Sequence, residues 1–238
     1  MGKCLTKLVF VGIWGLSFAA FISALFIGDW FKISMGFVAL MLLFIPFLIE
    51  KFLNLNLSGA LKISYYLFIF ASLILGEVFA FYGPFPWWDV VLHFLSGFLL
   101  AGVGLSLVGI LVKGKQTRSF ALLFAFCFSI TLGVVWECTE FTFDMLVRTD
   151  AQKDAHVRQI STITMQRDGG NRPVRVDNIE RTEIFITDGE PIVINEGYLD
   201  IGLMDTMKDL LVNIGGAGLF LVFGAFYTKD KLKLVAKK

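Results

Sequence analysis

Six stretches of apolar residues, each long enough to cross a bilayer, constrain this chain more than any other feature. The first, Leu8–Ile27, holds 20 residues without a charged side chain, and about 20 apolar residues in a helix match the hydrocarbon thickness of a membrane. It is longer than the apolar core of a signal peptide and lacks a clear cleavage site, so we expect it to be retained as a span. The other five predicted spans are Ile33–Ile49, Ile63–Tyr82, Val90–Val112, Phe120–Leu146 and Leu203–Tyr227.

The overall composition supports a membrane protein. Hydrophobic residues make up 56% of the 238 residues, the mean hydropathy is +0.74, and charged residues are 17%, below the roughly 25% of an average globular chain. The net charge of +1 comes with no basic patch apart from those flanking the spans, which argues against a nucleic-acid partner. The sequence therefore predicts an all-α polytopic membrane protein with six transmembrane helices.

The stretch between the fifth and sixth spans has a different character. From Arg148 to Asp200 it carries seven Arg/Lys and ten Asp/Glu, and its apolar residues alternate with polar ones. Thr182–Thr187 and Ile192–Asn195 flank the sequence Asp-Gly-Glu-Pro, which predicts a β-hairpin. We expect four parts: transmembrane helices one to five over residues 1–147, a small β-rich extracytoplasmic insert over 148–201, helix six over 202–228, and a cytoplasmic basic tail over 229–238.

The distribution of Lys and Arg predicts the orientation in the membrane. If the N-terminus is cytoplasmic, the short inner segments hold twelve Lys/Arg and the short outer loops hold only Lys32. Cytoplasmic loops carry an excess of these residues, and a long loop such as the insert is exempt from the rule. An even number of spans then places both termini in the cytoplasm.

The ionisable residues inside the predicted spans share one depth. With this orientation each lies within roughly 15 Å of the outer end of its span, at about 1.5 Å per residue. A carboxylate at membrane depth is costly unless it is paired, hydrated or bound to an ion. The candidate site residues are Asp89 and His93 (i, i+4), Glu137 and Glu140 (i, i+3), and Asp205, Asp209 and Asn213 (i, i+4, i+8), so that each set lines one face of its helix.

Plainer interpretations exist for single members of this set. Asp89 lies near a span end and could be an interfacial cap, His93 could be a packing residue, and Lys208 could neutralise Asp205. Together, however, the acids outnumber the cations at this depth, so either several acids are protonated or a cation lies among them. Carboxylate and amide oxygens suit Mg²⁺, Mn²⁺ or Ca²⁺, and the histidine widens the choice to Zn²⁺ or Fe. A divalent metal cation is thus the candidate cofactor, of undecided identity, and protonated acids are the alternative.

Three motifs resemble those of known families. WDVVLHFLSG (Trp88–Gly97), WECTEF (Trp136–Phe141) and GYLDIGLMDTMKDLLVNIGGA (Gly197–Ala217) resemble the signatures of the YjdF-type bacterial inner-membrane proteins. The same order of acids is similar to the VanZ-like membrane proteins, whose founding member is linked to glycopeptide (teicoplanin) resistance. The resemblance implies the bacterial cytoplasmic membrane as the location. The long insert, and Glu140 where VanZ-like proteins often have Gln, depart from the VanZ-like pattern.

Three interpretations of the function are compatible with these residues. The first is an enzyme in which a cation polarises a phosphoryl or acyl oxygen of a lipid headgroup or a lipid-linked cell-envelope precursor, with His93 or Glu137 as general base. The second is a proton- or cation-coupled transporter, although transporter sites usually lie near the midplane between internal repeats. A structural or regulatory envelope protein is a third interpretation. The catalytic candidates are His93, Glu137, Glu140, Asp205 and Asp209.

Overall fold

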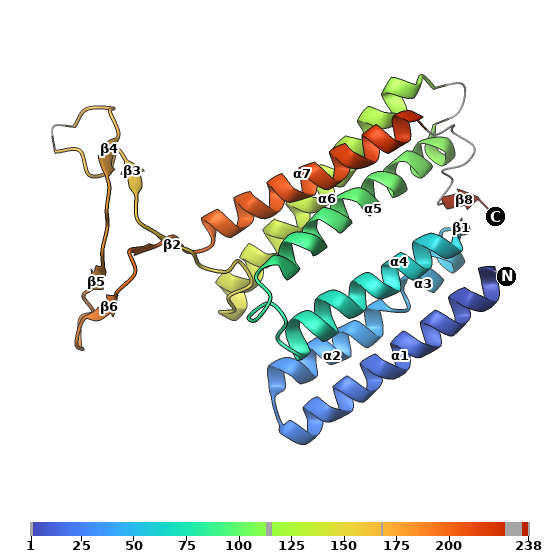
Figure 1. The fold of residues 1–238 in the computed structure, drawn as a ribbon, viewed down its shortest axis with the longest axis horizontal. Helices are drawn as coiled ribbons and strands as arrows, with labels where there is room; N and C mark the ends of the chain where they lie inside the picture. The colour runs from blue at the N-terminus through green and yellow to red at the C-terminus, as the bar shows by residue number, and fades with distance from the viewer. Residues whose placement is uncertain (1, 113–115, 168, 227–234, 238) are drawn as a thin grey trace. The chain divides into compact units, whose positions relative to one another are not determined.

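The computed structural model describes residues 2–112, 116–167, 169–226 and 235–237. Within these residues six helical segments are long and apolar enough to cross a membrane, and short strands lie between the fifth and the sixth (Figure 1). This confirms the predicted fold class. The segments are Cys4–Ile27, Trp30–Phe52, Gly59–Val78, Trp87–Leu111, Arg118–Val147 and Leu203–Gly224. The chain divides into two compact units, Met1–Val134 with Asp209–Lys238, and Val135–Lys208.

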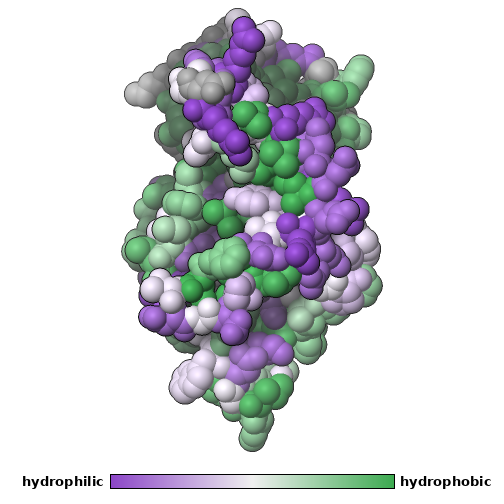
Figure 2. All heavy atoms as spheres, turned by 90° about the vertical axis from the view of Figure 1, so that its left-hand side faces the viewer, coloured by the Kyte–Doolittle hydropathy of each residue, from purple (hydrophilic) through white to green (hydrophobic). Residues whose placement is uncertain are grey.

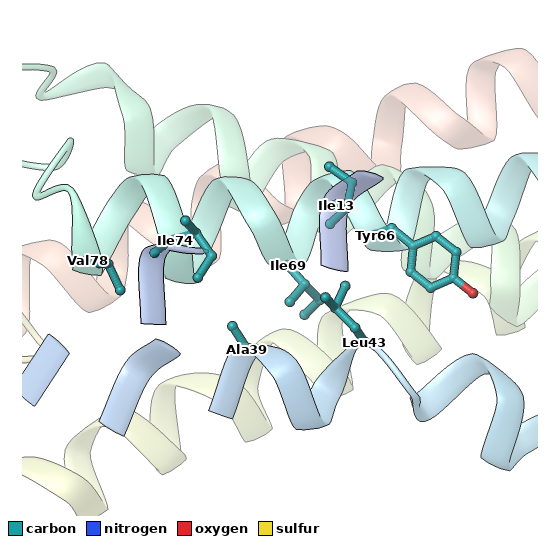
Figure 3. Packing of buried hydrophobic residues seen from close by; sticks show 8 residues of the cluster. Ile13, Ala39, Leu43, Tyr66, Ile69, Ile74 and Val78 are labelled. Atoms are coloured by element: carbon teal, nitrogen blue, oxygen red, sulfur yellow. The ribbon is translucent and has the colours of Figure 1, made fainter. Parts of the chain in front are cut away.

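The N-terminal helices of the first unit share an apolar core. Helices α1 (Gly2–Ile27), α2 (Trp30–Leu42) and α4 (Gly59–Ile69) lie side by side together with η1 (Phe70–Val78). Figure 3 shows apolar side chains packed between these helices. Their burial keeps apolar surface away from polar surroundings. The buried residues of this cluster are Ile13, Ala20, Ala39, Leu43, Tyr66, Ile69, Ile74 and Val78.

The sequence predicts one continuous helix over Ile33–Ile49 for the second span, but the structure divides this span into two helices. Helix α2 ends at Leu42 and α3 (Ile45–Phe52) begins one residue before Pro46. Pro46 has no N–H and therefore cannot donate to the carbonyl of Leu42 four residues earlier. The hydroxyl of Tyr65 on α4 donates to that carbonyl instead, at 2.9 Å. A neighbouring helix thus satisfies the acceptor that the proline leaves open.

The third span changes its helical type halfway. The sequence predicts one helix over Ile63–Tyr82, whereas the structure has α4 up to Ile69, then the π-helix η1 over Phe70–Val78, and turns from there on. The wider i→i+5 pattern continues at its end, where the N–H of Phe79 donates to the carbonyl of Ile74 at 2.9 Å. π-Helical turns are rare and often occur at functional sites.

Helices α5 (Trp87–Leu111), α6 (Arg118–Val147) and α7 (Leu203–Phe226) carry the remaining spans. In the first unit, the hydroxyl of Ser129 on α6 donates to the carbonyl of Gly97 on α5 at 2.8 Å. A Cβ added at Gly104 would lie 3.0 Å from Cα of Ala125, so α5 and α6 are in close contact there. Ala101, Ala217 and Phe220 form a small buried cluster between α5 and α7. Small residues are common where membrane helices pack closely.

Glu50 of α3 contacts the two elements that follow α3 in the chain. Oε1 of Glu50 accepts from the N–H of Leu57 at 2.9 Å and from Nζ of Lys62 at 3.0 Å. Strand β1 (Leu55–Leu57) pairs antiparallel with β8 (Val235–Lys237). The predicted basic tail 229–238 and the predicted end of the sixth span at Tyr227 otherwise lie outside the described residues.

The second unit contains the insert. Helix α6 ends at Val147, and Arg148 has the left-handed φ of 62° that commonly ends a helix. The Asp144 carboxylate accepts from the hydroxyl of Thr149 and from the N–H groups of Ala151 and Gln152, at 2.7–2.9 Å. The strands that follow form antiparallel pairs: β2 (His156–Val157) with β7 (Tyr198–Leu199), β3 (Ile160–Thr162) with β4 (Val174–Val176), and β5 (Thr182–Ile184) with β6 (Ile192–Ile194).

The predicted hairpin around Asp188-Gly189 is present, but its strands are shorter than expected. Ile184 pairs with Ile192, so residues 185–191 form the connection instead of a tight two-residue turn. Several apolar side chains of the insert are exposed, among them Phe185 and Ile201. The space-filling view accordingly shows hydrophilic and hydrophobic side chains interspersed (Figure 2).

Candidate functional site

Two carboxylates and one imidazole meet between α5 and α7. Nε2 of His93 lies 3.6 Å from Oδ1 of Asp89 and 3.6 Å from Oδ2 of Asp209. One potential ligand atom from each of the three residues lies within 4.8 Å of the other two. The side chains of Asp89 and His93 are 14% and 13% exposed and that of Asp209 is 2% exposed. We call these residues the Asp89–His93–Asp209 group.

Local sequence explains two of the three positions. Helix α5 begins after Pro86, whose fixed φ favours a helix start. Asp89 lies in the first turn of this helix, where the helix dipole favours a negative charge. His93 follows four residues later and therefore lies on the same face. The i, i+4 spacing alone thus brings an acid and an imidazole together near the start of α5.

Asp209 reaches this pair because α5 and α7 approach at backbone distance. A Cβ added at Gly97 would collide with the carbonyl of Asn213, and one added at Gly216 would collide with the carbonyl of Phe94. Both positions therefore require glycine. This close approach lies one to two turns beyond His93 and Asp209. It keeps the side chains of His93 and Asp209 close to each other.

Asn213 ties the same two helices together next to the group. Its Nδ2 donates to Oγ of Ser96 at 3.2 Å, and the Ser96 hydroxyl donates to the carbonyl of His93 at 2.8 Å. Asn213 is 2% exposed, and a Cβ added at Gly133 of α6 would lie 3.0 Å from its Oδ1. The amide of Asn213 therefore fills a narrow space where α5, α6 and α7 converge.

Ser96 is a residue that the sequence analysis did not single out. It lies three residues after His93 and so shares its helix face. That spacing, combined with the polar residue Asn213 on another span, was the signal that could have identified it. Its hydroxyl links Asn213 to the backbone of His93.

The remaining predicted site residues lie in the second unit. Glu137 on α6 is buried and Glu140 is partly buried. Asp205, in the first turn of α7, lies 3.9 Å from Nζ of Lys208, the partner that the sequence suggested for it. The structure thus brings together Asp89, His93 and Asp209 with Asn213 beside them, whereas a role for Glu137, Glu140 and Asp205 stays a prediction.

The donor set of the Asp89–His93–Asp209 group suits a divalent cation. One imidazole nitrogen and two carboxylates are ligands for Zn²⁺, Fe or Mn²⁺, and the carboxylates alone would also suit Mg²⁺. A bound cation would offset the negative charge that two ionised carboxylates beside one imidazole carry. The two separations of 3.6 Å at Nε2 of His93 are compatible with ligation of one ion, because two ligand atoms with metal bonds of about 2.0–2.3 Å can lie up to about 4.6 Å apart.

Comparisons with known proteins agree with the membrane fold. The chain is 26% identical over 104 residues to an "Uncharacterized protein" of Thermotoga maritima, covering 44% of this chain and 54% of that protein. The chain thus matches about half the length of that relative. No solved structure gives a significant match. A family model described as "Predicted membrane protein (DUF2238)" matches residues 7–230. The chain therefore belongs to this family of predicted membrane proteins, which is the YjdF-type family that its three motifs resembled.

Proposed function

We propose that this protein binds a divalent cation at the Asp89–His93–Asp209 group and uses it to act on lipid headgroups or lipid-linked envelope precursors. The observation that carries the proposal is the convergence of three ligand-type side chains from two spans. A carboxylate as deeply buried as Asp209 in an apolar helix bundle needs a compensating charge, and ionisable residues inside membranes commonly mark functional sites.

The depth of the group favours a headgroup over a solute carried across the membrane. Asp89 lies two residues after the start of α5, and Asp209 lies six residues after the start of α7. At about 1.5 Å per residue the group is within about 10 Å of these helix ends. Polar headgroups lie at the level of span ends, whereas transporter sites usually lie near the midplane.

The chemistry follows from the ligands. A cation held by the group would polarise a phosphoryl or acyl oxygen of the substrate. With His93 holding the cation, a further group would act as the general base. Membrane lipids are thus both the surroundings and the substrate class of this proposal.

The orientation belongs to the same proposal. We place the protein in a bacterial cytoplasmic membrane with both termini in the cytoplasm, because twelve Lys/Arg fall in the short inner segments and one in the outer loops. Reporter fusions test this. A fluorescent protein that folds only in the cytoplasm should fluoresce when fused after Lys238, and should stay dark when inserted after Gly189 of the insert. The opposite pattern would mean that the Asp89–His93–Asp209 group lies on the cytoplasmic side of the membrane.

Metal content is the decisive measurement. Protein purified in mild detergent and loaded separately with Zn²⁺, Mn²⁺ or Mg²⁺ should retain about one ion per chain, measured by elemental mass spectrometry. His93→Gln and Asp209→Asn should abolish retention. Asp29→Asn is the matched control, because Asp29 caps α2 outside the group and asparagine is an equally good cap. Equal metal content in all four proteins would refute the cation site.

Activity is tested on lipids extracted from the host envelope. Wild-type protein with the retained metal should convert a headgroup-bearing lipid in a mass-spectrometric assay, and Asp209→Asn should not. Cation-driven solute uptake into proteoliposomes, with no lipid conversion, would instead assign the site to a carrier.

A further inference from the structure

Trp88, the residue before Asp89, donates a hydrogen bond to a different helix. Nε1 of Trp88 donates to the carbonyl of Ala71 on η1 at 3.1 Å. Asp89 itself lies 3.6 Å from His93, which in turn contacts α7. Adjacent residues on an α-helix are about 100° apart. The first turn of α5 is therefore held by η1 through Trp88 on one side and by the contacts of the Asp89–His93–Asp209 group on another.

The connection between η1 and α5 makes a second bond of the same kind. The hydroxyl of Tyr82 donates to the carbonyl of Ser72, the neighbour of Ala71, at 3.3 Å. The ring of Tyr82 lies so close to Gly76 that a Cβ there would collide with it. Tyr82 of the connection and Trp88 at the start of α5 thus bind adjacent carbonyls of the π-helix.

Aromatic packing stiffens this connection. The ring of Trp88 lies 5.4 Å from that of Phe81 in an edge arrangement, and Phe81 lies 5.2 Å from Phe85. Aromatic pairs at such separations stabilise each other beyond the burial of their area. Trp87 also belongs to this aromatic cluster, at 5.7 Å from Trp88, but its side chain is 54% exposed.

We infer that Trp88 is a positioning residue for the cation site, because its bond to η1 sets the rotation of the first turn of α5 and with it the place of Asp89. This rests on the proposed cation binding. Small displacements of a ligand matter, since the groups that orient metal ligands typically change affinity by about 10–100-fold when they are removed. Trp88 acts one residue away from the ligand, so we expect the lower end of that range.

Trp88→Phe is the direct test, because phenylalanine keeps an aromatic ring and removes the N–H. Titration calorimetry of the purified full chain with Zn²⁺ or Mn²⁺ should show binding about 10-fold weaker than that of wild type. Trp87→Phe is the matched control on the same helical turn and should stay within about twofold of wild type, as expected for a surface change. Unchanged affinity in Trp88→Phe would overturn the inference.

A double-mutant cycle separates positioning from general support of the fold. In an Asp89→Asn background the ligand that Trp88 is inferred to place is already lost, so adding Trp88→Phe should change the remaining affinity less than twofold. An equal loss in both backgrounds would mean that Trp88 supports the fold alone, and would overturn the inference.

Two further outcomes are distinguishable. If Trp88→Phe does not fold, Tyr82→Phe removes the neighbouring bond to Ser72 and should weaken binding at least threefold, and unchanged binding there would overturn the inference. If wild-type protein binds neither ion, the proposed cation site fails and the positioning role fails with it. Binding by wild type that Trp88→Phe leaves intact removes only the positioning role.

Discussion

Nε2 of His93 lies 3.6 Å from Oδ2 of Asp209, and this contact joins two membrane-spanning helices that are far apart in sequence. Asp209 is almost fully buried, and Oδ1 of Asp89 lies at the same distance from the same imidazole nitrogen. Two acids that share one imidazole repel each other unless a proton or a cation is held between them. The stability of the first unit should therefore respond to divalent cations.

Asp209→Asn tests this response through thermal stability. At a metal concentration about 100 times the dissociation constant, binding to the folded state stabilises by about 2.7 kcal/mol. The melting temperature of wild-type protein in detergent, followed by tryptophan fluorescence, should rise with metal, and that of Asp209→Asn should not. In chelator the variant should be at least as stable as wild type, because it relieves the repulsion between Asp89 and Asp209. An equal metal-induced rise in both proteins would contradict the assignment.

The stability of the insert should depend on pH through Asp154. Partial burial and the nearby carboxylates of Asp150, Asp200 and Asp144 raise the pKa of Asp154 above its usual value. The folded insert therefore binds this proton more tightly than the unfolded chain, and the stabilisation present in acid is lost as the pH rises through the raised pKa. Asp154→Asn should slow amide hydrogen exchange of the insert at pH 7.

The effect should be small, because Asp154 is largely exposed and solvent screens its neighbours. At a pH below the ordinary value for an aspartate, wild type and Asp154→Asn should exchange at the same relative rate. Asp188→Asn, in the connection of the hairpin, is the control and should exchange like wild type at both pH values. Protection by Asp154→Asn that persists in acid would exclude a titration effect.

Gly97 and Gly109 on α5 should respond oppositely to alanine. A Cβ at Gly97 would collide with the carbonyl of Asn213, whereas nothing lies within 4 Å of one at Gly109. Gly97→Ala should separate α5 from α7, destabilise by about 1–3 kcal/mol and weaken metal binding. Gly109→Ala should be neutral or stabilise by up to about 1 kcal/mol, because alanine favours the helix. Denaturant unfolding in mixed micelles measures both, and similar effects at the two positions would argue against the close contact.

The effect of replacing Gly76 on η1 by alanine should depend on Tyr82. A Cβ at Gly76 would displace the Tyr82 ring and break its bond to Ser72, which we expect to cost about 1–2 kcal/mol. In a Tyr82→Ala background the obstacle is absent, so Gly76→Ala should cost little there. A double-mutant cycle of unfolding free energies measures the coupling. Additive effects would mean that the ring and the glycine do not compete for the same space.

The spans could be predicted from the sequence because length and apolarity are local properties. The break before Pro46 could not, because its form depends on Tyr65 of another helix, which donates to the carbonyl of Leu42. The π-helix was missed for a related reason. Nothing in the sequence of Phe70–Val78 distinguishes i→i+5 from i→i+4 bonding, and the side chains that bind its carbonyls, Tyr82 and Trp88, follow it in the chain.

The candidate site was only partly accessible from sequence. The spacing of Asp89 and His93 predicts that they share a helix face, and the structure has them 3.6 Å apart. Their meeting with Asp209 depends on which helices are neighbours, which no local pattern specifies. The tertiary structure supplies this through the contacts at Gly97 and Gly216. The VanZ-like resemblance and the roles of Glu137, Glu140 and Asp205 stay predictions.

The backbone contact between α5 and α7 implies a sequence pattern by which other proteins with this arrangement can be found. Because neither Gly97 nor Gly216 has room for a side chain, each glycine should accompany the acids on its own helix. The combined pattern D-x₃-H-x₃-G (residues 89–97) followed by D-x₃-N-x₂-G (residues 209–216) therefore encodes both ligands and helix spacing. A genome survey with this paired pattern would recover chains with the same group of side chains between two closely packed helices, even where overall identity is low.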